Sequence, residues 1–327
     1  MKQQRLRQIL DRARRQRVLV IGDLMLDEFV WGTVGRISPE APVPVVEVSG
    51  ESFYPGGAAN VARNLREFTG HVSISGMIGR DRCGNQLLEL LAKNRIDTAA
   101  CAITAGFSTI VKTRIIARQQ QVVRVDREKI IPPKKRDIAA VVAAVKKKLP
   151  QIDAVLFEDY AKGFLAEELV AQIVKVARAL GKIVAVDPNP KHDIPWRGVS
   201  VVKPNRTEAF HAAGFLDDSD NGSLEEVGRR LLEKWETELL LITLGDEGMM
   251  LFQRNKEPHR VPTRAQQVFD VSGAGDTAIA LFTLALTAGA SPLEATDIAN
   301  HASAVVVGKL GTATVTREEL LENFKNA

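Results

Sequence analysis

Six short apolar runs recur along this chain with helical patterns between most of them, and this repetition constrains the fold more than any other feature. The runs are VLVIGD (18–23), VSISGMIG (72–79), AVLFEDY (154–160), IVAVDP (183–188), VSVVKPN (199–205) and LLLITLG (239–245). They are rich in Val, Ile and Leu, which is typical of parallel strands buried on both faces. The helical patterns cover residues 57–68, 84–94, 135–148, 165–180 and 223–235. Strands that alternate with helices predict βαβ units and an open, doubly wound α/β sheet.

Two stretches interrupt this alternation before the sequence becomes mostly helical through 275–289, 291–308 and 316–325. One contains GRISPEAPVPVVEV (35–48), with three prolines within six positions and then a strand-like run. The other, at 108–126, alternates apolar and polar residues. Alternation favours half-exposed antiparallel strands. We therefore expect a single domain over 1–327, with a small β lid formed by about 29–50 and 107–127.

The net charge of +4 comes from the N-terminus and not from the body of the chain. Residues 1–17 hold seven of the 44 Lys and Arg residues and one of the 40 Asp and Glu residues, so this segment carries +6 and the remainder carries −2. Its apolar residues follow helical spacing, which predicts an amphipathic basic helix, peripheral to the rest. They are Leu6, Ile9, Leu10 and Ala13. A nucleic-acid groove needs basic residues clustered on the folded body, so we expect no nucleic-acid partner.

No apolar run in the sequence is long enough to span a bilayer, so we expect no membrane partner either. The two cysteines, Cys83 and Cys101, have neither metal-ligand nor redox spacing. Cysteines that remain reduced are typical of the cytoplasm, which is the location we expect.

The most specific chemical motif is DVSGAGDT (270–277), in which Gly273 and Gly275 flank Ala274 before an apolar helix. Glycines allow close backbone approach, and a helix start presents free N–H groups at the positive end of its dipole. The motif therefore predicts an anion hole. Asp276, in the first turn, is a candidate general base that takes a hydroxyl proton beside the held phosphate. The alternative is an acid at a helix start, stabilised by the dipole alone.

Two further motifs follow predicted strands. In KPNRTE (203–208), Asn205 and Glu208 are three residues apart and can hold Mg²⁺ through water, since Mg²⁺ prefers oxygen ligands. The same spacing fits a helix capping box, and spacing alone favours the cap. The stretch TLGDEGM (243–249) fits either backbone contact with phosphates or a plain hairpin turn.

The N-terminal third offers candidate sugar ligands. Gly56 and Gly57 precede a helix and allow the backbone to approach a sugar, with Asn60 on the first turn. Asp23 and Asp27 lie beyond the first strand and offer two carboxylates to sugar hydroxyls. A turn residue is the plainer interpretation of Asp23.

Together and in this order, these motifs resemble the ribokinase-like (PfkB) carbohydrate kinases, from about Val18 to the last helix. The resemblance implies an open α/β sheet with a small β lid, and ATP-dependent, Mg²⁺-assisted phosphorylation of a sugar hydroxyl; a monovalent cation such as K⁺ is compatible with it. It implies Asp276 as the base and Gly273, Ala274 and Gly275 as the anion hole. The nucleotide residues that it implies are Asn205, Arg206, Thr207, Glu208, Thr243, Gly245, Gly248 and Asn300, with Asn205 and Glu208 holding Mg²⁺ through water in place of the cap. Its sugar positions match Asp23, Asp27, Gly56, Gly57 and Asn60.

Five segments closely resemble a narrower group, the D-glycero-β-D-manno-heptose 7-phosphate kinases of ADP-heptose (lipopolysaccharide core precursor) synthesis. They are GDLMLDEFVWGTVGRISPEAPVPVVEV, PGGAANVARNL, EDYAKG, DVSGAGDT and VVVGKLGTATV. A 7-phosphate needs cations, and the candidates by composition and location are Lys112, Arg114, Arg118 and Arg124. The sequence departs from the family at Ser272, where Thr is common, and at DPNPK (187–191), where Asp-Pro-Lys is expected.

Two other functions compete with transfer of phosphate to O1 of this heptose phosphate. A PfkB-family kinase for another sugar or sugar phosphate, such as ribose or fructose 1-phosphate, is distinguished by a substrate panel. A non-catalytic sugar-binding protein is expected to lose the base or a motif glycine, and this sequence keeps both. Edge strands of a small lid need covering, so we expect a homodimer through the lid. Without a His-x-Gly-His segment, we expect a separate nucleotidyltransferase to act downstream.

Overall fold

The computed structural model describes residues 1–327 apart from 119, 216–222, 266, 310 and 326–327. The largest sheet in this described part has eight strands. Their spatial order is β14 (His259–Val261), β13 (Met249–Gln253), β12 (Leu239–Thr243), β11 (Val201–Val202), β10 (Ile183–Asp187), β9 (Ala154–Glu158), β1 (Arg17–Gly22) and β4 (His71–Ser75). The strands from β12 to β4 in this order run parallel to one another. At the other end of the sheet, β13 pairs antiparallel with β12, and β14 pairs antiparallel with β13. The predicted mostly parallel α/β sheet is confirmed.

The order of the strands determines where a ligand can bind. The chain passes from β1 to β4 on one side of β1, and it later returns to β9 on the other side. In open α/β sheets, ligands bind at the carboxyl ends of the strands where the strand order reverses. The parallel strands read as continuous apolar runs because helices cover both faces, and all five side chains of β9 are buried.

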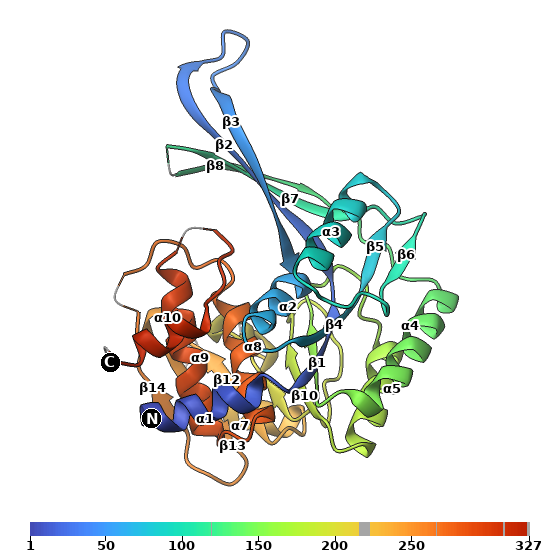
Figure 1. Ribbon diagram of the computed structural model, residues 1–327, viewed down its shortest axis with the longest axis vertical. Coiled ribbons are helices and arrows are strands. Elements are labelled where there is room, and N and C mark those ends of the chain that lie inside the picture. Colours follow the sequence, from blue (N-terminus) through green and yellow to red (C-terminus); the bar gives the residue numbers. More distant parts are fainter. Residues whose placement is uncertain (119, 216–222, 266, 310, 326–327) are drawn as a thin grey trace.

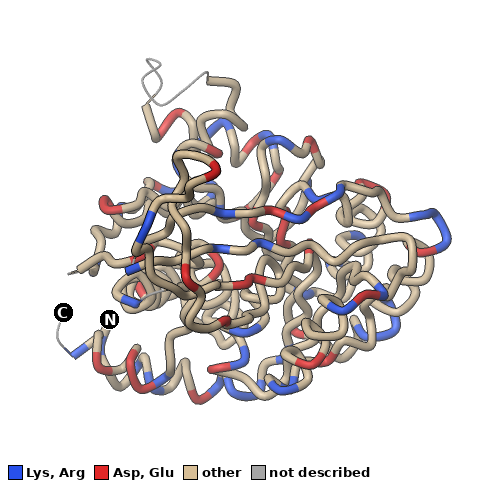
Figure 2. Tube along the Cα trace, turned by 90° about the horizontal axis from the view of Figure 1, so that it is seen from above, with Lys and Arg blue, Asp and Glu red and all other residues tan. Residues whose placement is uncertain are grey.

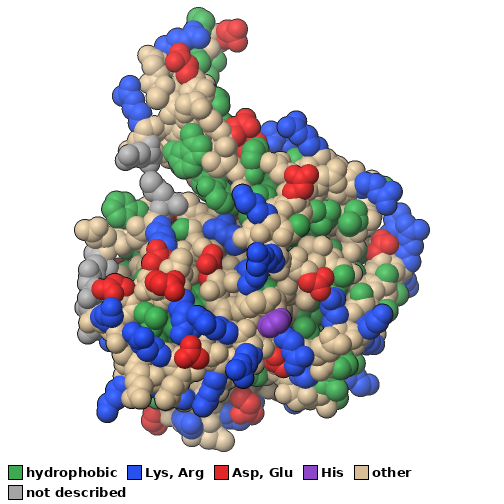
Figure 3. All heavy atoms as spheres, viewed as in Figure 1, with side chains coloured by type: hydrophobic (Ala, Val, Ile, Leu, Met, Phe, Trp, Pro, Cys, Tyr) green, Lys and Arg blue, Asp and Glu red, His purple; other side chains and the backbone are tan. Residues whose placement is uncertain are grey.

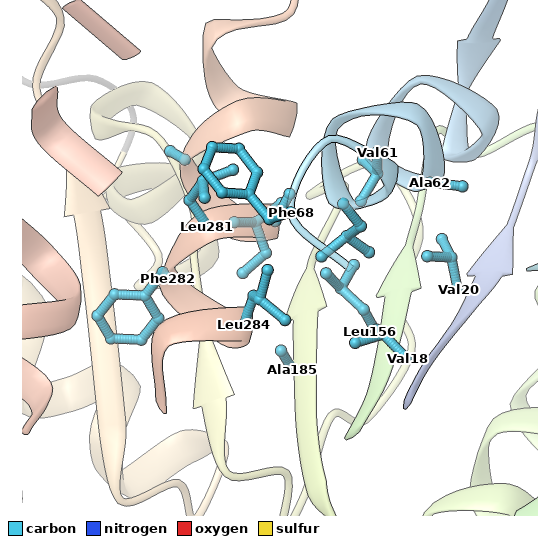
Figure 4. Packing of buried hydrophobic residues seen from close by; sticks show 14 of the residues in the cluster. Val18, Val20, Val61, Ala62, Phe68, Leu156, Ala185, Leu281, Phe282 and Leu284 are labelled. Atoms are coloured by element: carbon cyan, nitrogen blue, oxygen red, sulfur yellow. The ribbon is translucent and has the colours of Figure 1, made fainter. Parts of the chain in front are cut away.

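Helices form a layer on each face of this sheet (Figure 1). One layer contains α1 (Gln3–Ala13), α2 (Ala58–Arg66), α8 (Ala274–Thr287), α9 (Pro292–Val307) and α10 (Arg317–Asn323). The other contains α4 (Lys135–Lys148), α5 (Glu167–Ala179), α6 (Arg206–Ala212) and α7 (Leu224–Lys234). Figure 4 shows Val61 of α2 and Leu284 of α8 packed over Val20, Leu156 and Ala185 of the sheet. This packing fixes the start of α2 beside the start of α8.

The sequence suggested that the first helix is peripheral, but in the structure it is part of the core. Leu6 and Ile9 have no exposed surface, and α1 packs against α8 and α10. Its basic face makes surface ion pairs, such as that of Arg5 with Glu294 at 2.8 Å. Figure 2 shows that Lys and Arg are interspersed with Asp and Glu around the molecule.

A second sheet stands away from the body as a projecting arm (Figures 1 and 3). Its order is β3 (Pro44–Gly57), β2 (Leu24–Ile37), β7 (Ile110–Ala117) and β8 (Gln120–Arg127). The two interruptions of the alternating pattern therefore pair into the expected lid, of which residue 119 lies outside the described residues. The expectation of antiparallel strands holds for the two hairpins, β2–β3 and β7–β8, but β2 and β7 pair in parallel. Both of these strands start at the base of the lid and run outward, which requires the parallel arrangement.

Some predicted bounds differ from the observed ones. The run at 72–79 divides into β4 and β5 (Met77–Gly79), and β5 pairs with β6 (Ala102–Thr104) in a separate sheet. The division falls at Gly76, where a Cβ would lie 2.4 Å from Cγ of Leu24. The helix α3 (Arg82–Lys93) follows β5 and packs against the lid strands β2 and β3. Among the described helices, none has the length and apolar character needed to cross a membrane.

Candidate active site

A cavity of about 740 Å³ lies at the carboxyl ends of the central strands and the start of α8. Every residue predicted for the nucleotide lines it. These residues are Asn205, Arg206, Thr207, Glu208, Thr243, Gly245, Gly248 and Asn300. Ala274, Gly275 and Asp276 line it as well. The structure thus brings together groups that are as far apart in sequence as Asn205 and Asn300, although their roles stay predictions.

The start of α8 has the geometry of an anion hole. Gly273, just before the helix, has a φ of 80°, a left-handed conformation that favours glycine. The Ala274 N–H donates to the Val271 carbonyl at 3.2 Å, and the Gly275 peptide group follows in the first turn, where backbone N–H groups have no partner within the helix. A Cβ on Gly275 would lie 3.3 Å from Nζ of Lys203. A backbone dipole and an ammonium group therefore adjoin at this point, and both attract an anion.

Asp276 is held by two hydrogen bonds from different parts of the chain. Nδ2 of Asn60 donates to Oδ2 at 2.7 Å, and the Tyr160 hydroxyl donates to Oδ1 at 2.8 Å. Burial raises the pKa of Asp276, while the hydrogen bonds from Asn60 and Tyr160 lower it. Each carboxylate oxygen keeps a further lone pair. An oriented, buried carboxylate of this kind is suited to accept a proton from a hydroxyl group.

Asn205 and Glu208 form the capping box that their spacing favoured. Asn205 Oδ1 accepts from the Glu208 N–H at 2.9 Å, and Glu208 Oε2 accepts from the Asn205 N–H at 2.8 Å. Both residues also line the cavity. Glu208 Oε1 makes no hydrogen bond with the described part of the chain, so the cap leaves one carboxylate oxygen available. Glu208 can therefore cap the helix with one carboxylate oxygen and offer the other to a metal ion.

The charged residues of the cavity that were not predicted include Glu158, Asp187 and Lys203. Carboxylate oxygens of Glu158, Asp187 and Asp276 lie within 4.8 Å of one another, and Lys203 Nζ lies 2.7 Å from Asp187 Oδ2. Burial lowers the pKa of Lys203, but the neighbouring Asp187 carboxylate more than compensates, and the net pKa is raised. Their motifs EDYAKG, DPNPK and KPNRTE were recognised at strand ends, but the spacing within each motif gave no reason to pair them.

The cavity has donors suited to Mg²⁺, which prefers oxygen ligands and keeps several waters. Glu158 Oε1 is buried and has no partner among the described residues. Burial raises the pKa of Glu158 well above its usual range, with Asp187 and Asp276 adding to the effect. A bound cation would give Glu158 Oε1 a partner and would reduce the repulsion between these carboxylates. The residues present therefore fit a divalent cation.

The predicted sugar residues Asp27, Gly56, Gly57 and Asn60 lie where the lid meets α2. Asp27 pairs with Arg114 of the lid at 2.5 Å. A Cβ on Gly56 would lie 2.5 Å from Asp27 Oδ2, so glycine permits the carboxylate to lie against the backbone. Gly57 directly precedes α2, and Asn60 connects this region to Asp276.

Asp23 stabilises the loop that follows β9. Its carboxylate accepts hydrogen bonds from the backbone N–H groups of Tyr160, Lys162 and Phe164 at 3.0 to 3.1 Å. These bonds order the loop after β9 and so position the Tyr160 hydroxyl at Asp276. A sugar contact by Asp23 stays a prediction, and the plainer interpretation as a turn residue describes what its oxygens do here.

The four lid cations predicted for a 7-phosphate do not form one free positive cluster. Lys112 pairs with Asp126 at 3.0 Å and Arg124 pairs with the same carboxylate at 2.9 Å. Arg114 pairs with Asp27. Arg118 lies exposed at the turn between β7 and β8. Of the four, therefore, only Arg118 has a charge that is not balanced by a described carboxylate.

Comparison with known proteins assigns the family. Residues 15–319 match the family described as pfkB family carbohydrate kinase. The chain belongs to this family. It is a sugar kinase, as its motifs implied.

The curated relatives are longer than this chain. Bifunctional protein HldE of Desulfatibacillum aliphaticivorans is 43% identical over 304 residues, covering 93% of this chain and 62% of that protein. The protein of the same name from Caulobacter vibrioides is also 43% identical, with the same shares covered. The chain thus spans less than two thirds of the length of these relatives.

Solved structures of low sequence identity share the fold. Ribokinase of Arabidopsis thaliana, complexed with ribose and ATP, has a TM-score of 0.72 at 19% identity and covers 95% of this chain and 99% of that chain. Phosphofructokinase-2 of Escherichia coli, in complex with substrates and products, has a TM-score of 0.76 at 17% identity, with the same shares covered. The ribokinase-like fold is therefore confirmed.

Proposed function

We propose that this protein transfers the γ-phosphoryl group of ATP to O1 of D-glycero-β-D-manno-heptose 7-phosphate, which gives the 1,7-bisphosphate. The observation that carries the proposal is the position of Asp276, which lines the nucleotide cavity and is also bonded to Asn60 beside the lid. The names of the curated relatives and the five matching segments support the heptose phosphate as acceptor.

In the proposed reaction, Asp276 removes the proton from the O1 hydroxyl as the oxygen attacks the γ-phosphorus. Asn60 and Tyr160 keep the carboxylate oriented while the bond to the leaving ADP oxygen breaks. The N–H groups of Ala274 and Gly275 and the Lys203 ammonium stabilise the charge of the transferring group. The lid excludes water, which would otherwise compete as acceptor.

Asn205, Glu208, Glu158 and Asp187 are the residues that would hold Mg²⁺. A bound Mg²⁺ would neutralise negative charge on the phosphate groups of ATP. A requirement for K⁺ is compatible with the family and is tested by exchanging the monovalent salt.

The experiment that tests the role of the base is Asp276→Asn with ADP release as the readout. General-base catalysis contributes about 10²- to 10⁴-fold in rate. We expect kcat to fall by that amount while the sugar still binds, measured by calorimetry. Turnover close to wild type would disprove the role of Asp276.

The acceptor is tested by a panel of heptose 7-phosphate, unphosphorylated heptose, ribose and fructose 1-phosphate. We expect the highest kcat/KM with heptose 7-phosphate. A higher kcat/KM with another sugar would identify that sugar as the acceptor and would leave the kinase assignment intact.

We further propose that two copies associate through their lids. Exposed apolar side chains on the arm support this, with Ile37, Val43 and Val48 at 61%, 50% and 58% exposure. Edge strands with exposed apolar residues favour pairing with another chain. A monomeric mass by light scattering at micromolar concentration would contradict the dimer. We expect the enzyme to act in the cytoplasm and its product to pass to a nucleotidyltransferase.

A further inference from the structure

Three buried polar atoms on α2 and on the loop that contacts it have no partner in the described part of the chain. They are Asn60 Oδ1, Arg63 Nη1 and Thr312 Oγ1. Asn60 donates to Asp276, and Arg63 Nη2 donates to the Thr312 carbonyl at 2.5 Å, so two separate hydrogen bonds start from α2, which carries both Asn60 and Arg63. Burial of a polar atom without a partner is costly, so such atoms are rare in folded proteins. Several such atoms on α2 and the adjoining loop, with Asn60 also bonded to Asp276, indicate that a ligand completes them.

Arg63 faces the place where the lid meets the body. It follows Asn60 by three residues on α2, so both lie on the same side of the helix. Its guanidinium lies 5.5 Å from the centre of the Tyr54 ring. Tyr54 is the partner of Asp27 in the register of β2 and β3, so their side chains share a face of the lid. Arg63 is therefore placed between Tyr54 and the loop at Thr312, beside the predicted sugar residues.

The charge of Arg63 is not balanced by an ion pair with any carboxylate among the described residues. Lys112, Arg114 and Arg124 of the lid each have such a partner. Burial lowers the pKa of Arg63, and the neighbouring Tyr54, Glu67 and Asp27 act in the opposite direction. An arginine remains protonated in proteins. A partly buried positive charge with an unpaired donor is therefore available for an anion, and the paired lid cations are not.

We propose that Arg63, together with the Thr312 hydroxyl, recognises the phosphate that the acceptor sugar already carries. The inference rests on the proposed function and names the group that selects a phosphorylated acceptor. A guanidinium binds phosphate through charge-assisted hydrogen bonds, which are stronger than those between neutral groups. Arg63 Nη1 supplies one such donor, and the Thr312 hydroxyl can supply another. The Thr312 carbonyl bonded to Nη2 fixes the orientation of the guanidinium.

The test compares Arg63→Gln with wild type on heptose 7-phosphate and on unphosphorylated heptose. Gln removes the charge and keeps a polar side chain that can donate hydrogen bonds. Arg66→Gln is the matched control, because Arg66 lies one turn further along α2 and also donates to a carbonyl, that of Thr69 at 2.8 Å. Arg63→Lys keeps the charge and serves as a second variant. Thermal unfolding of every variant checks that the fold is intact.

We expect Arg63→Gln to lower kcat/KM for the heptose phosphate by about 10- to 100-fold, as for the loss of a hydrogen bond between charged groups. The loss should appear in KM, with kcat nearly unchanged. Unphosphorylated heptose should be affected less than about twofold, since it carries no phosphate for the guanidinium to bind. Arg63→Lys should recover part of the loss, and Arg66→Gln should match wild type for both sugars.

An equal loss with both sugars would overturn the inference and assign Arg63 a structural role, while leaving the heptose phosphate as acceptor. If wild type instead prefers another sugar phosphate, the proposed function fails, and the same comparison with that sugar pair decides the role of Arg63. A wild type that prefers unphosphorylated sugars would refute both proposals.

Discussion

The hydrogen bond from Tyr160 to Asp276 gives a prediction whose size follows from the structure. Tyr160→Phe removes the donor at 2.8 Å from Oδ1 and leaves the Asn60 donor at 2.7 Å from Oδ2. A hydrogen bond to a charged group contributes about 1.5 to 3 kcal/mol, and one pKa unit corresponds to about 1.4 kcal/mol. The bond favours the ionised carboxylate, so its loss should raise the pKa of Asp276 further.

The assay is the pH dependence of kcat/KM for the sugar, measured by ADP release. A base with a raised pKa becomes protonated at higher pH, so the acidic limb of the profile should move to higher pH, and kcat/KM on that limb should fall by about 10- to 100-fold. At alkaline pH the carboxylate is ionised in both proteins, and the variant should approach the wild-type rate. A uniform loss at every pH, with the limb unmoved, would refute the reasoning and indicate that Tyr160 only packs beside the base. Thermal unfolding serves as the control for folding.

Two further predictions concern the N-terminal helix and the metal. Deletion of residues 1–15 removes the buried side chains of Leu6, Ile9 and Leu10. Burial of each contributes about 1.5 to 3 kcal/mol, so the free energy of unfolding should fall by about 5 to 9 kcal/mol. An unchanged melting temperature would contradict the packing described for α1. Glu208→Gln keeps the capping box, since Gln serves at that position, but removes a carboxylate, so the Mg²⁺ concentration for half-maximal rate should rise by about 10- to 100-fold with little change in melting temperature. A normal Mg²⁺ requirement in that variant would leave Glu208 with the cap alone.

The parts of the site that could be predicted from sequence are those carried by single local motifs. Asn205 to Glu208 and Thr243 to Gly248 each follow a strand end, and parallel strand ends meet at one edge of the sheet. The residues predicted for the nucleotide therefore line one cavity, and their role in nucleotide binding stays a prediction. The same logic predicted the lid, because alternating residues differ visibly from the buried runs around them.

The parts that could not be predicted depend on contacts between distant segments. The bond from Tyr160 to Asp276 joins residues 116 positions apart. For the lid cations, composition revealed Lys112, Arg114 and Arg124 but not the carboxylates that neutralise them. The basic composition of α1 suggested a peripheral helix, but its four apolar residues are buried with no or almost no exposure, and α1 packs against α8 and α10.

The loop at Gly311 and Thr312 touches both sides of the site. The Gly311 N–H donates to Asp270 Oδ2 at 3.1 Å, just before the anion hole, and a Cβ on Gly311 would lie 3.6 Å from the Phe29 ring of the lid. The Thr312 carbonyl holds Arg63. We expect this loop to couple the two substrates, so that a non-hydrolysable ATP analogue tightens acceptor binding in calorimetry. Thermodynamic reciprocity then requires the acceptor to tighten nucleotide binding by the same factor; equal acceptor affinities with and without the analogue would show that the two substrates bind independently.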